Sequence, residues 1–145
     1  MAILKIVNHP DELLRKRSKE VVDFSPRLHQ LLDDMLDTMD AVGGVGIAAV
    51  QVGVLWRVCI VATAKGIVEF INPVIVASDK VKEGEEACLS MPGTSGMVER
   101  AQKVTVRAQD RNGKFFERKF TGRDAVCVAH EFDHLDGVLY TDKVL

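Results

Sequence analysis

The clearest pattern early in the chain is an apolar stripe with helical spacing. Ser25 and Pro26 suit the cap and the first position of a helix, and Gly43-Gly44 favours its end. We therefore expect a helix over residues 26–42 that turns one face to the core. Apolar residues three and four apart form that face: Leu28, Leu31, Leu32, Met35, Leu36, Met39 and Val42.

Short apolar or alternating runs, which are typical of strands, replace the helical pattern further along the chain. In one of them Val104, Val106 and Ala108 alternate with polar residues, which predicts a half-buried strand. The segment Asp110-Arg111-Asn112-Gly113 predicts a hairpin turn. We expect strands over residues 57–61, 69–71, 74–76, 80–86, 103–107 and 114–120.

A second helix is expected near the end of the chain. Thr121 suits its N-cap, Asp124 three residues later resembles a capping box, and Gly137 suits its C-terminal end. The helix is apolar nearly all round, as in a buried helix. The elements together predict an α+β fold with antiparallel strands packed around a buried C-terminal helix and the N-terminal helix on the outside.

Composition narrows the class of protein. With 145 residues, 47% hydrophobic and 28% charged, the chain fits a single globular domain over residues 1–145. The net charge of -2 does not favour nucleic acid as a partner, and no apolar run approaches the ~18 residues of a membrane span. Three cysteines and an N-terminus without signal-peptide features fit the cytoplasm.

The candidate chemistry lies on the second helix, in the H-E-x-x-H pattern of His130, Glu131 and His134. Residues four apart share one face of a helix, so the two imidazoles can hold one metal ion beside a carboxylate that acts as general base. Polar groups on a buried helix also need partners, because unpaired buried polar groups are costly. A metal site at this point of the chain needs at least one more protein ligand.

Cys88 is the best candidate for the third ligand, because it follows a predicted strand and a thiolate suits Fe(II) and Zn(II). Cys59 lies within an apolar run and fits a buried small hydrophobic residue better. His9 and His29 lie in contexts that favour solvated histidines.

Three segments together resemble the peptide deformylase family, whose members show G-x-G-[LI]-A-A-x-Q, E-G-C-L-S and H-E-x-D-H-L-x-G in this order. Here they are residues 44–51 (GVGIAAVQ), 86–90 (EACLS) and 130–137 (HEFDHLDG). The similarity runs from about residue 4 to the end. Ala87 departs from the family, which usually has Gly there; if that position needs a positive φ or touches substrate, Ala impairs the site.

The resemblance implies an enzyme that hydrolyses the N-formyl group of formyl-methionyl peptides and releases formate. Cys88, His130 and His134 would hold a divalent ion that activates a water molecule, and Glu131 would carry the proton. The implied working metal is Fe(II), with Zn(II), Ni(II) or Co(II) able to replace it. The implied substrates are nascent chains near the ribosome, with no role for nucleic acid or membrane.

The resemblance also assigns the substrate contacts. The Gln51 amide and the Leu89 backbone N–H would stabilise the formyl oxygen, although a loop amide that bonds its own backbone is the alternative for Gln51. Gly44 and Gly46 would let an extended peptide pair with the backbone. The remaining implied contacts are Val45, Glu86, Val126 and Cys127 around the methionine, and Arg100; core packing for Val126 and Cys127, and a solvated Arg100, are the alternatives.

Three other functions compete with this interpretation. A zinc peptidase of the longer type needs a third histidine downstream, which the sequence lacks. A non-catalytic, metal-stabilised or peptide-binding relative would not need Glu131. The glycines at 44 and 46 also match a dinucleotide fingerprint, but that fingerprint must follow a strand and open a helix, and here it follows a predicted helix.

Overall fold

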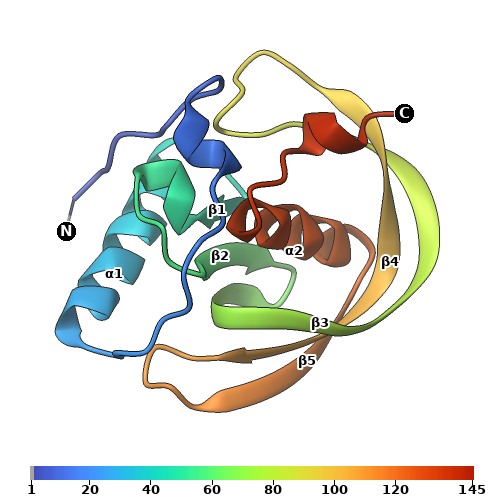
Figure 1. Cartoon of the computed structure of the whole chain (residues 1–145). Coiled ribbons are helices and arrows are strands. Elements are labelled where there is room, and N and C mark those ends of the chain that lie inside the picture. Colours follow the sequence, from blue (N-terminus) through green and yellow to red (C-terminus); the bar gives the residue numbers. More distant parts are fainter. Residues whose placement is uncertain (1) are drawn as a thin grey trace.

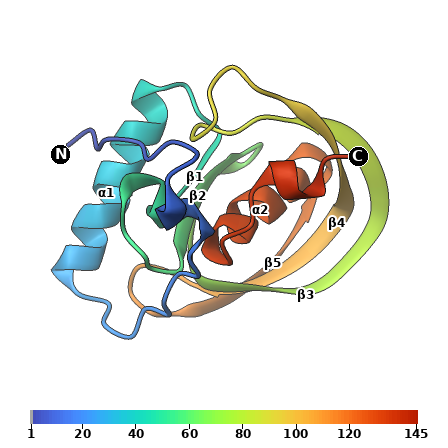
Figure 2. The same cartoon turned by 45° about the horizontal axis from the view of Figure 1, so that its top comes forward.

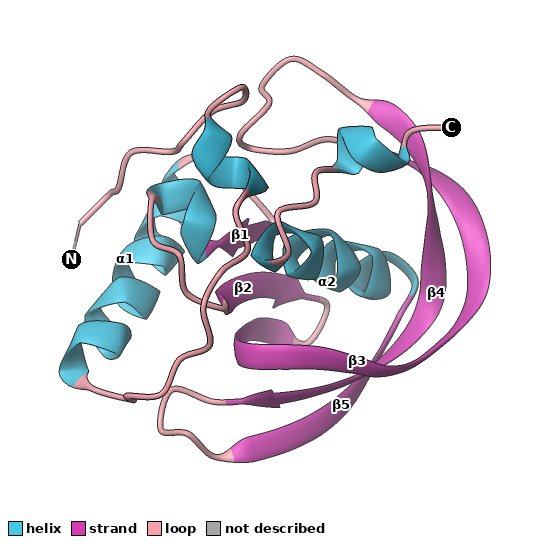
Figure 3. Ribbon diagram, viewed as in Figure 1, coloured by secondary structure: helices cyan, strands magenta, loops and turns pink. Residues whose placement is uncertain are grey.

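A computed structural model describes residues 2–145, and Figure 1 shows two α-helices and a curved antiparallel sheet in that part of the chain. The five strands follow chain order across the sheet, from β1 at one edge to β5 at the other (Figure 3). None of the helices in residues 2–145 is long and apolar enough to cross a membrane. The elements are η1 (Glu12–Arg15), α1 (Pro26–Ala41), β1 (Gly46–Ala48), η2 (Ala49–Val52), β2 (Val58–Thr63), β3 (Gly66–Glu86), β4 (Gly96–Gln109), β5 (Phe115–Thr121), α2 (Gly122–Leu135) and η3 (Tyr140–Lys143), where η marks a 3-10 helix.

The sheet separates the two helices. In Figures 1 and 2, α2 lies inside the curve of the sheet and α1 lies on the outside, near β1 and β2. Strand β2 is buried on both faces: Cys59 and Val61 join the core around α2, whereas Val58 and Ile60 join the core under α1. Burial on both faces explains why this strand is a continuous apolar run without alternation. The predicted fold class is confirmed.

Strands β3 and β4 are much longer than expected. The three separate strands predicted between residues 69 and 86 are one strand of 21 residues, and β4 begins at Gly96, before the predicted residue 103. The register between β3 and β4 shifts on either side of Val74 and Ile75, so bulges absorb Pro73, which cannot donate a ladder hydrogen bond. Pairing with β4 therefore keeps β3 continuous through Pro73, where the local sequence predicts that a strand ends.

The helix boundaries agree with the prediction, but some details of the ends do not. Val42 is exposed, because α1 has ended one residue earlier. The expected capping box at Thr121 is wrong, since the Asp124 carboxylate accepts the backbone N–H of Ala64. Gly137 does end the region of α2, with a φ of 74°, and a Cβ there would lie 2.3 Å from the Arg15 oxygen. Only glycine fits this position.

The core between α2 and the sheet is centred on Phe70, which is fully buried. Its ring lies 6.1 Å from that of Phe116, 5.7 Å from Phe120 and 5.2 Å from Phe132, centroid to centroid. Cys59 belongs to this core, where burial raises the pKa of its thiol well above the usual value, so it behaves as the expected small hydrophobic residue. The core fixes the position of α2 inside the sheet.

Candidate active site

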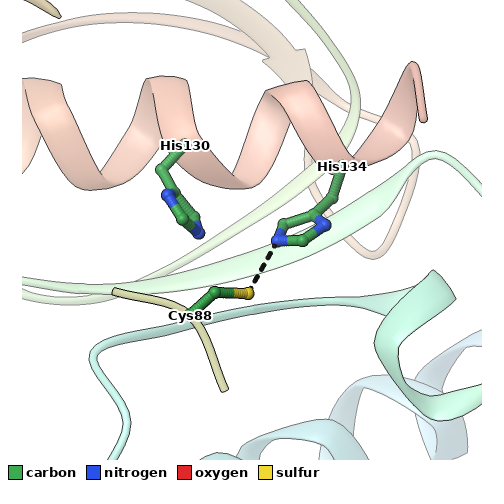
Figure 4. Close-up of side chains that lie close together, drawn as sticks. All are labelled: Cys88, His130 and His134. Atoms are coloured by element: carbon green, nitrogen blue, oxygen red, sulfur yellow. Dashed lines mark hydrogen bonds between the residues drawn. The ribbon is translucent and has the colours of Figure 1, made fainter. Parts of the chain in front are cut away.

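The three expected metal ligands meet at one point. Cys88 lies just after β3, and His130 and His134 lie one turn apart on α2, with all three side chains directed toward one another (Figure 4). Their possible ligand atoms lie within 4.8 Å of one another, and the Cys88 Sγ is 3.3 Å from the His134 Nε2. The fold therefore places Cys88, at the end of β3, beside two histidines of α2 that lie at least 42 positions later in the sequence.

The chemistry of this group fits a divalent metal ion. One thiolate and two imidazoles suit Zn(II) and Fe(II) and leave a coordination position for a substrate or water. The His130 Nδ1 lies 2.8 Å from the Glu86 Oε1 and donates to it, which leaves Nε2 as the ligand atom. Burial lowers the pKa of His134 to about 3. Burial would also lower the pKa of His130, but hydrogen bonds with Cys88 and Glu86 outweigh it and raise that pKa to about 10, so a metal bound at both rings would displace a proton from His130.

Glu131 lies on α2 beside the ligands and is 6% exposed. Among residues 2–145, its Oε1 has no hydrogen-bond partner, although the atom is buried. A Cβ built on Gly46 would lie 2.6 Å from the Glu131 Oε2. The backbone of β1 therefore lies so close to this carboxylate that only a residue without a side chain fits at position 46 without a shift. Burial raises the pKa of Glu131 to about 7, which suits a group that both takes and gives a proton at neutral pH.

The side chain of Gln51 is held on both sides. Its Oε1 accepts the backbone N–H of Ala48 at 2.9 Å, as the structural alternative expected. Its amide nitrogen then points into the site, 3.2 Å from the Ser90 Oγ and 3.5 Å from the Cys88 Sγ. The backbone bond therefore orients the amide donor toward the metal ligands. Leu89 follows Cys88, and its side chain packs against Gly44, where a Cβ would lie 2.9 Å away.

A cavity of about 570 Å³ opens beside the candidate metal ligands. Val45, Glu86, Arg100, Val126 and Cys127 all line it, together with Ala87, His130 and Glu131. Val126 and Cys127 are half-buried, and Cys127 also packs against the core between α2 and the sheet, as the core-packing alternative expected. Gly44 and Gly46 contact Leu89 and Glu131 at the edge of the site and do not line this cavity. The lining residues that carry no sequence motif and were not anticipated are Lys82, Glu83, Gly84, Glu85, Val98, Gln102 and Arg123.

Two sequence interpretations need correction at this site. Arg100 is 5% exposed and pairs with Glu86 and Asp133, so the solvated alternative is wrong. His29 is half-buried, with its Nε2 2.6 Å from the Arg111 carbonyl oxygen, so it is not simply solvated. The concern about Ala87 also disappears in part, because its φ lies outside the left-handed region and alanine adopts it without strain.

The fold and the site define an α+β protein of the H-E-x-x-H class with a candidate metal centre inside a curved sheet. A sequence profile of the polypeptide deformylase family matches residues 3–145. The chain therefore belongs to the peptide deformylase family, hydrolases that remove the N-formyl group from nascent polypeptides.

Known relatives agree with this assignment along the whole chain. A peptide deformylase from Caldicellulosiruptor bescii is 50% identical over 145 residues, which cover 100% of this chain and 87% of the relative. The crystal structure of peptide deformylase from Thermotoga maritima superposes with a TM-score of 0.97 at 36% identity, covering 100% of this chain and 99% of that one. A Met-Ala-Ser-bound class I type b peptide deformylase from Acinetobacter baumannii superposes with a TM-score of 0.94 at 35% identity, covering 99% and 100%.

Proposed function

We propose that Cys88, His130 and His134 hold the catalytic ion, that this ion is Fe(II), and that residues 1–145 act as one catalytic domain. The convergence of the three ligand atoms within 4.8 Å is the observation that carries this proposal. When bound, the ion would supply Lewis-acid chemistry and make a water molecule acidic enough to lose a proton near neutral pH. Zn(II), Ni(II) and Co(II) suit the same thiolate and imidazole donors and are the expected substitutes.

Glu131 takes the proton of the attacking water and delivers it to the leaving nitrogen. The water oxygen bonds to the formyl carbon, the carbon–nitrogen bond breaks, and formate and a free α-amine leave. A raised pKa of about 7 supports this role, since a carboxylate of ordinary pKa is a weaker base and is almost never protonated at pH 7. The unpartnered Oε1 supplies an acceptor for that proton.

The formyl oxygen gains negative charge as water adds, and this chain offers two donors for it. The Gln51 amide points toward the Cys88 Sγ, and the Leu89 backbone N–H follows that cysteine directly. Donors that are fixed before the reaction stabilise the developing charge without reorganisation. Glycine at positions 44 and 46 leaves room for an extended peptide beside the strand.

The substrate is the N-terminal formyl-methionine of a nascent chain, met near the ribosome in the cytoplasm. The cavity takes the methionine side chain against Val45, Glu86, Val126 and Cys127, and the buried Arg100 borders it beside Glu86. The A. baumannii relative binds Met-Ala-Ser, which corresponds to the deformylated start of such a chain.

The proposal is tested on protein purified without oxygen. Bound metal is measured by elemental analysis, and formate release is measured with a formyl-methionyl tripeptide. We expect Fe(II) near one equivalent, turnover that air destroys because iron and thiolate oxidise, and activity restored by Fe(II) or Co(II). Metal-replete protein that binds the peptide but releases no formate would show a non-catalytic relative.

Glu131→Gln separates metal binding from proton transfer. The variant is expected to keep the metal and lose ~100-fold or more in turnover. Unchanged turnover in this variant would remove Glu131 from the mechanism.

A further inference from the structure

We propose that Arg100 is a positioning residue for the metal centre, acting through Glu86 on His130, and that it makes no direct contact with substrate. The inference rests on the proposed function of His130 as a metal ligand. It changes the role that the family resemblance suggested for Arg100, which was contact with the substrate.

The guanidinium of Arg100 bonds to a carboxylate through each of its three nitrogens. Its Nε lies 2.8 Å from the Glu86 Oε2, its Nη2 lies 3.0 Å from the Glu86 Oε1, and its Nη1 lies 2.5 Å from the Asp133 Oδ2. The side chain is 5% exposed although its residue borders the cavity. Two carboxylates thus engage three of the five N–H groups, one on each nitrogen, and hold the guanidinium in a buried position.

The fork of Arg100 fixes the plane of the Glu86 carboxylate. Glu86 in turn accepts the His130 Nδ1–H at 2.8 Å, with the same Oε1 that accepts from Arg100. That bond selects the tautomer of His130 and aims its Nε2 at the ligand group. Without Arg100 the buried carboxylate would lose the two N–H groups that this cation donates to it and would no longer be held in the plane that His130 requires.

Asp133 connects the same network to the ligand helix. It lies on α2 next to His134, contacts Arg100, and also pairs with the Lys143 Nζ at 3.2 Å. Asp133 does not line the cavity, so it cannot act by touching the peptide there. The network therefore joins β3, β4 and α2 behind the ligands. Changes to its members should alter metal affinity more than they alter KM for the peptide.

Arg100→Lys tests the proposal, because it keeps the charge and removes the two-pronged geometry. Zn(II) and Co(II) affinities are measured by competition with a chelator, the Co(II) absorption spectrum is recorded, and kcat and KM are measured at saturating metal. We expect metal affinity ~10–100-fold weaker, an altered Co(II) spectrum, and KM within about threefold of wild type. Unchanged metal affinity and an unchanged Co(II) spectrum would overturn the proposal. If KM also rose tenfold, Arg100 would be a substrate contact.

Two further variants complete the test. Arg107→Lys, on the solvent side of the same strand, is the control and should leave metal affinity unchanged. Asp133→Asn should weaken metal affinity in the same direction, and its effect should not add to that of Arg100→Lys, because both act through one network. If Arg100→Lys does not fold, Asp133→Asn decides alone, and an affinity within twofold of wild type overturns the proposal. Metal affinity is measured without substrate, so it remains informative even if the protein releases no formate.

Discussion

Replacing Gly46 by alanine tests how closely β1 fits against the proposed catalytic carboxylate of Glu131. The added Cβ would lie 2.6 Å from the Glu131 Oε2, 2.9 Å from its Cγ and 3.0 Å from its Cδ. Ordinary contact begins near 3.4 Å, so the carboxylate must move by 3.4 - 2.6 = 0.8 Å, or the strand must move by as much. Glu131 is 6% exposed and its Cγ is crowded as well, so the side chain cannot simply swing its tip away.

The expected loss follows from that displacement. A shift of ~1 Å in a group that transfers a proton costs ~100-fold in rate, or about 2.7 kcal/mol of transition-state stabilisation. The φ of Gly46 lies outside the left-handed region, so alanine introduces a clash without backbone strain. Gly46→Ala should therefore lose ~100-fold in kcat and keep its metal, because Cys88, His130 and His134 are untouched.

The assay is formate release at saturating peptide, with metal content measured on the same sample. Gly44→Ala is the matched comparison: its Cβ would meet the Leu89 Cδ1 at 2.9 Å, at the end of a side chain that can rotate, and we expect a loss below about tenfold. Glu131→Asp should be less harmful in the Gly46→Ala background than in wild type, because a shorter side chain relieves the clash. A kcat for Gly46→Ala within threefold of wild type would refute this reasoning.

Four other changes probe the rest of the site and the core. Gln51→Glu keeps an acceptor for the Ala48 N–H but loses the amide donor, so kcat should fall ~100-fold while circular dichroism and metal content stay unchanged; equal turnover would remove Gln51 from oxyanion stabilisation. Ala87→Gly should change turnover less than threefold, since Ala87 already adopts its backbone conformation without strain, and a large gain would show that its methyl group obstructs the site. Phe70→Ala should lower the free energy of unfolding by ~3–5 kcal/mol in a denaturant titration, and a loss below 1 kcal/mol would mean that the aromatic core collapses around the gap. Burial raises the pKa of Glu86, but hydrogen bonds from His130 and Arg100 outweigh burial and lower it to about 2. The stability that the Glu86 carboxylate contributes is therefore complete above pH 4.5 and is lost as the pH falls toward 2. Urea titrations of the metal-free protein should show this pH dependence, and Glu86→Gln should weaken it.

Local patterns were enough to predict α1, α2 and the three residues that lie close enough to hold a metal ion. A stripe of apolar residues and a Ser-Pro start define α1 without information from elsewhere in the chain. His130 and His134 lie four apart on one helix, so their common face follows from helix geometry alone. Cys88 was accessible to the same reasoning because it directly follows a strand.

Local sequence patterns could not predict the contacts between segments that lie far apart in the chain. Arg100 follows Glu99 in a polar stretch, and its burial depends on carboxylates 14 and 33 positions away. The length of β3 likewise depends on pairing with β4, which carries the strand through Pro73 and the polar residues around Lys80. The part of the cavity wall formed by residues 82–85 was missed for the same reason, since nothing in their sequence marks them as lining a cavity.

The position of the three candidate metal ligands along the chain has a consequence for biosynthesis. Domains form from the N-terminus onward as the chain is made, so the segment that ends in Cys88 emerges well before α2. A chain that still lacks α2 offers one thiol and neither histidine, and cannot assemble the ligand group. A nascent chain therefore cannot hold the proposed ion until α2 has been made, and the proposed activity begins only when α2 enters the curve of the sheet.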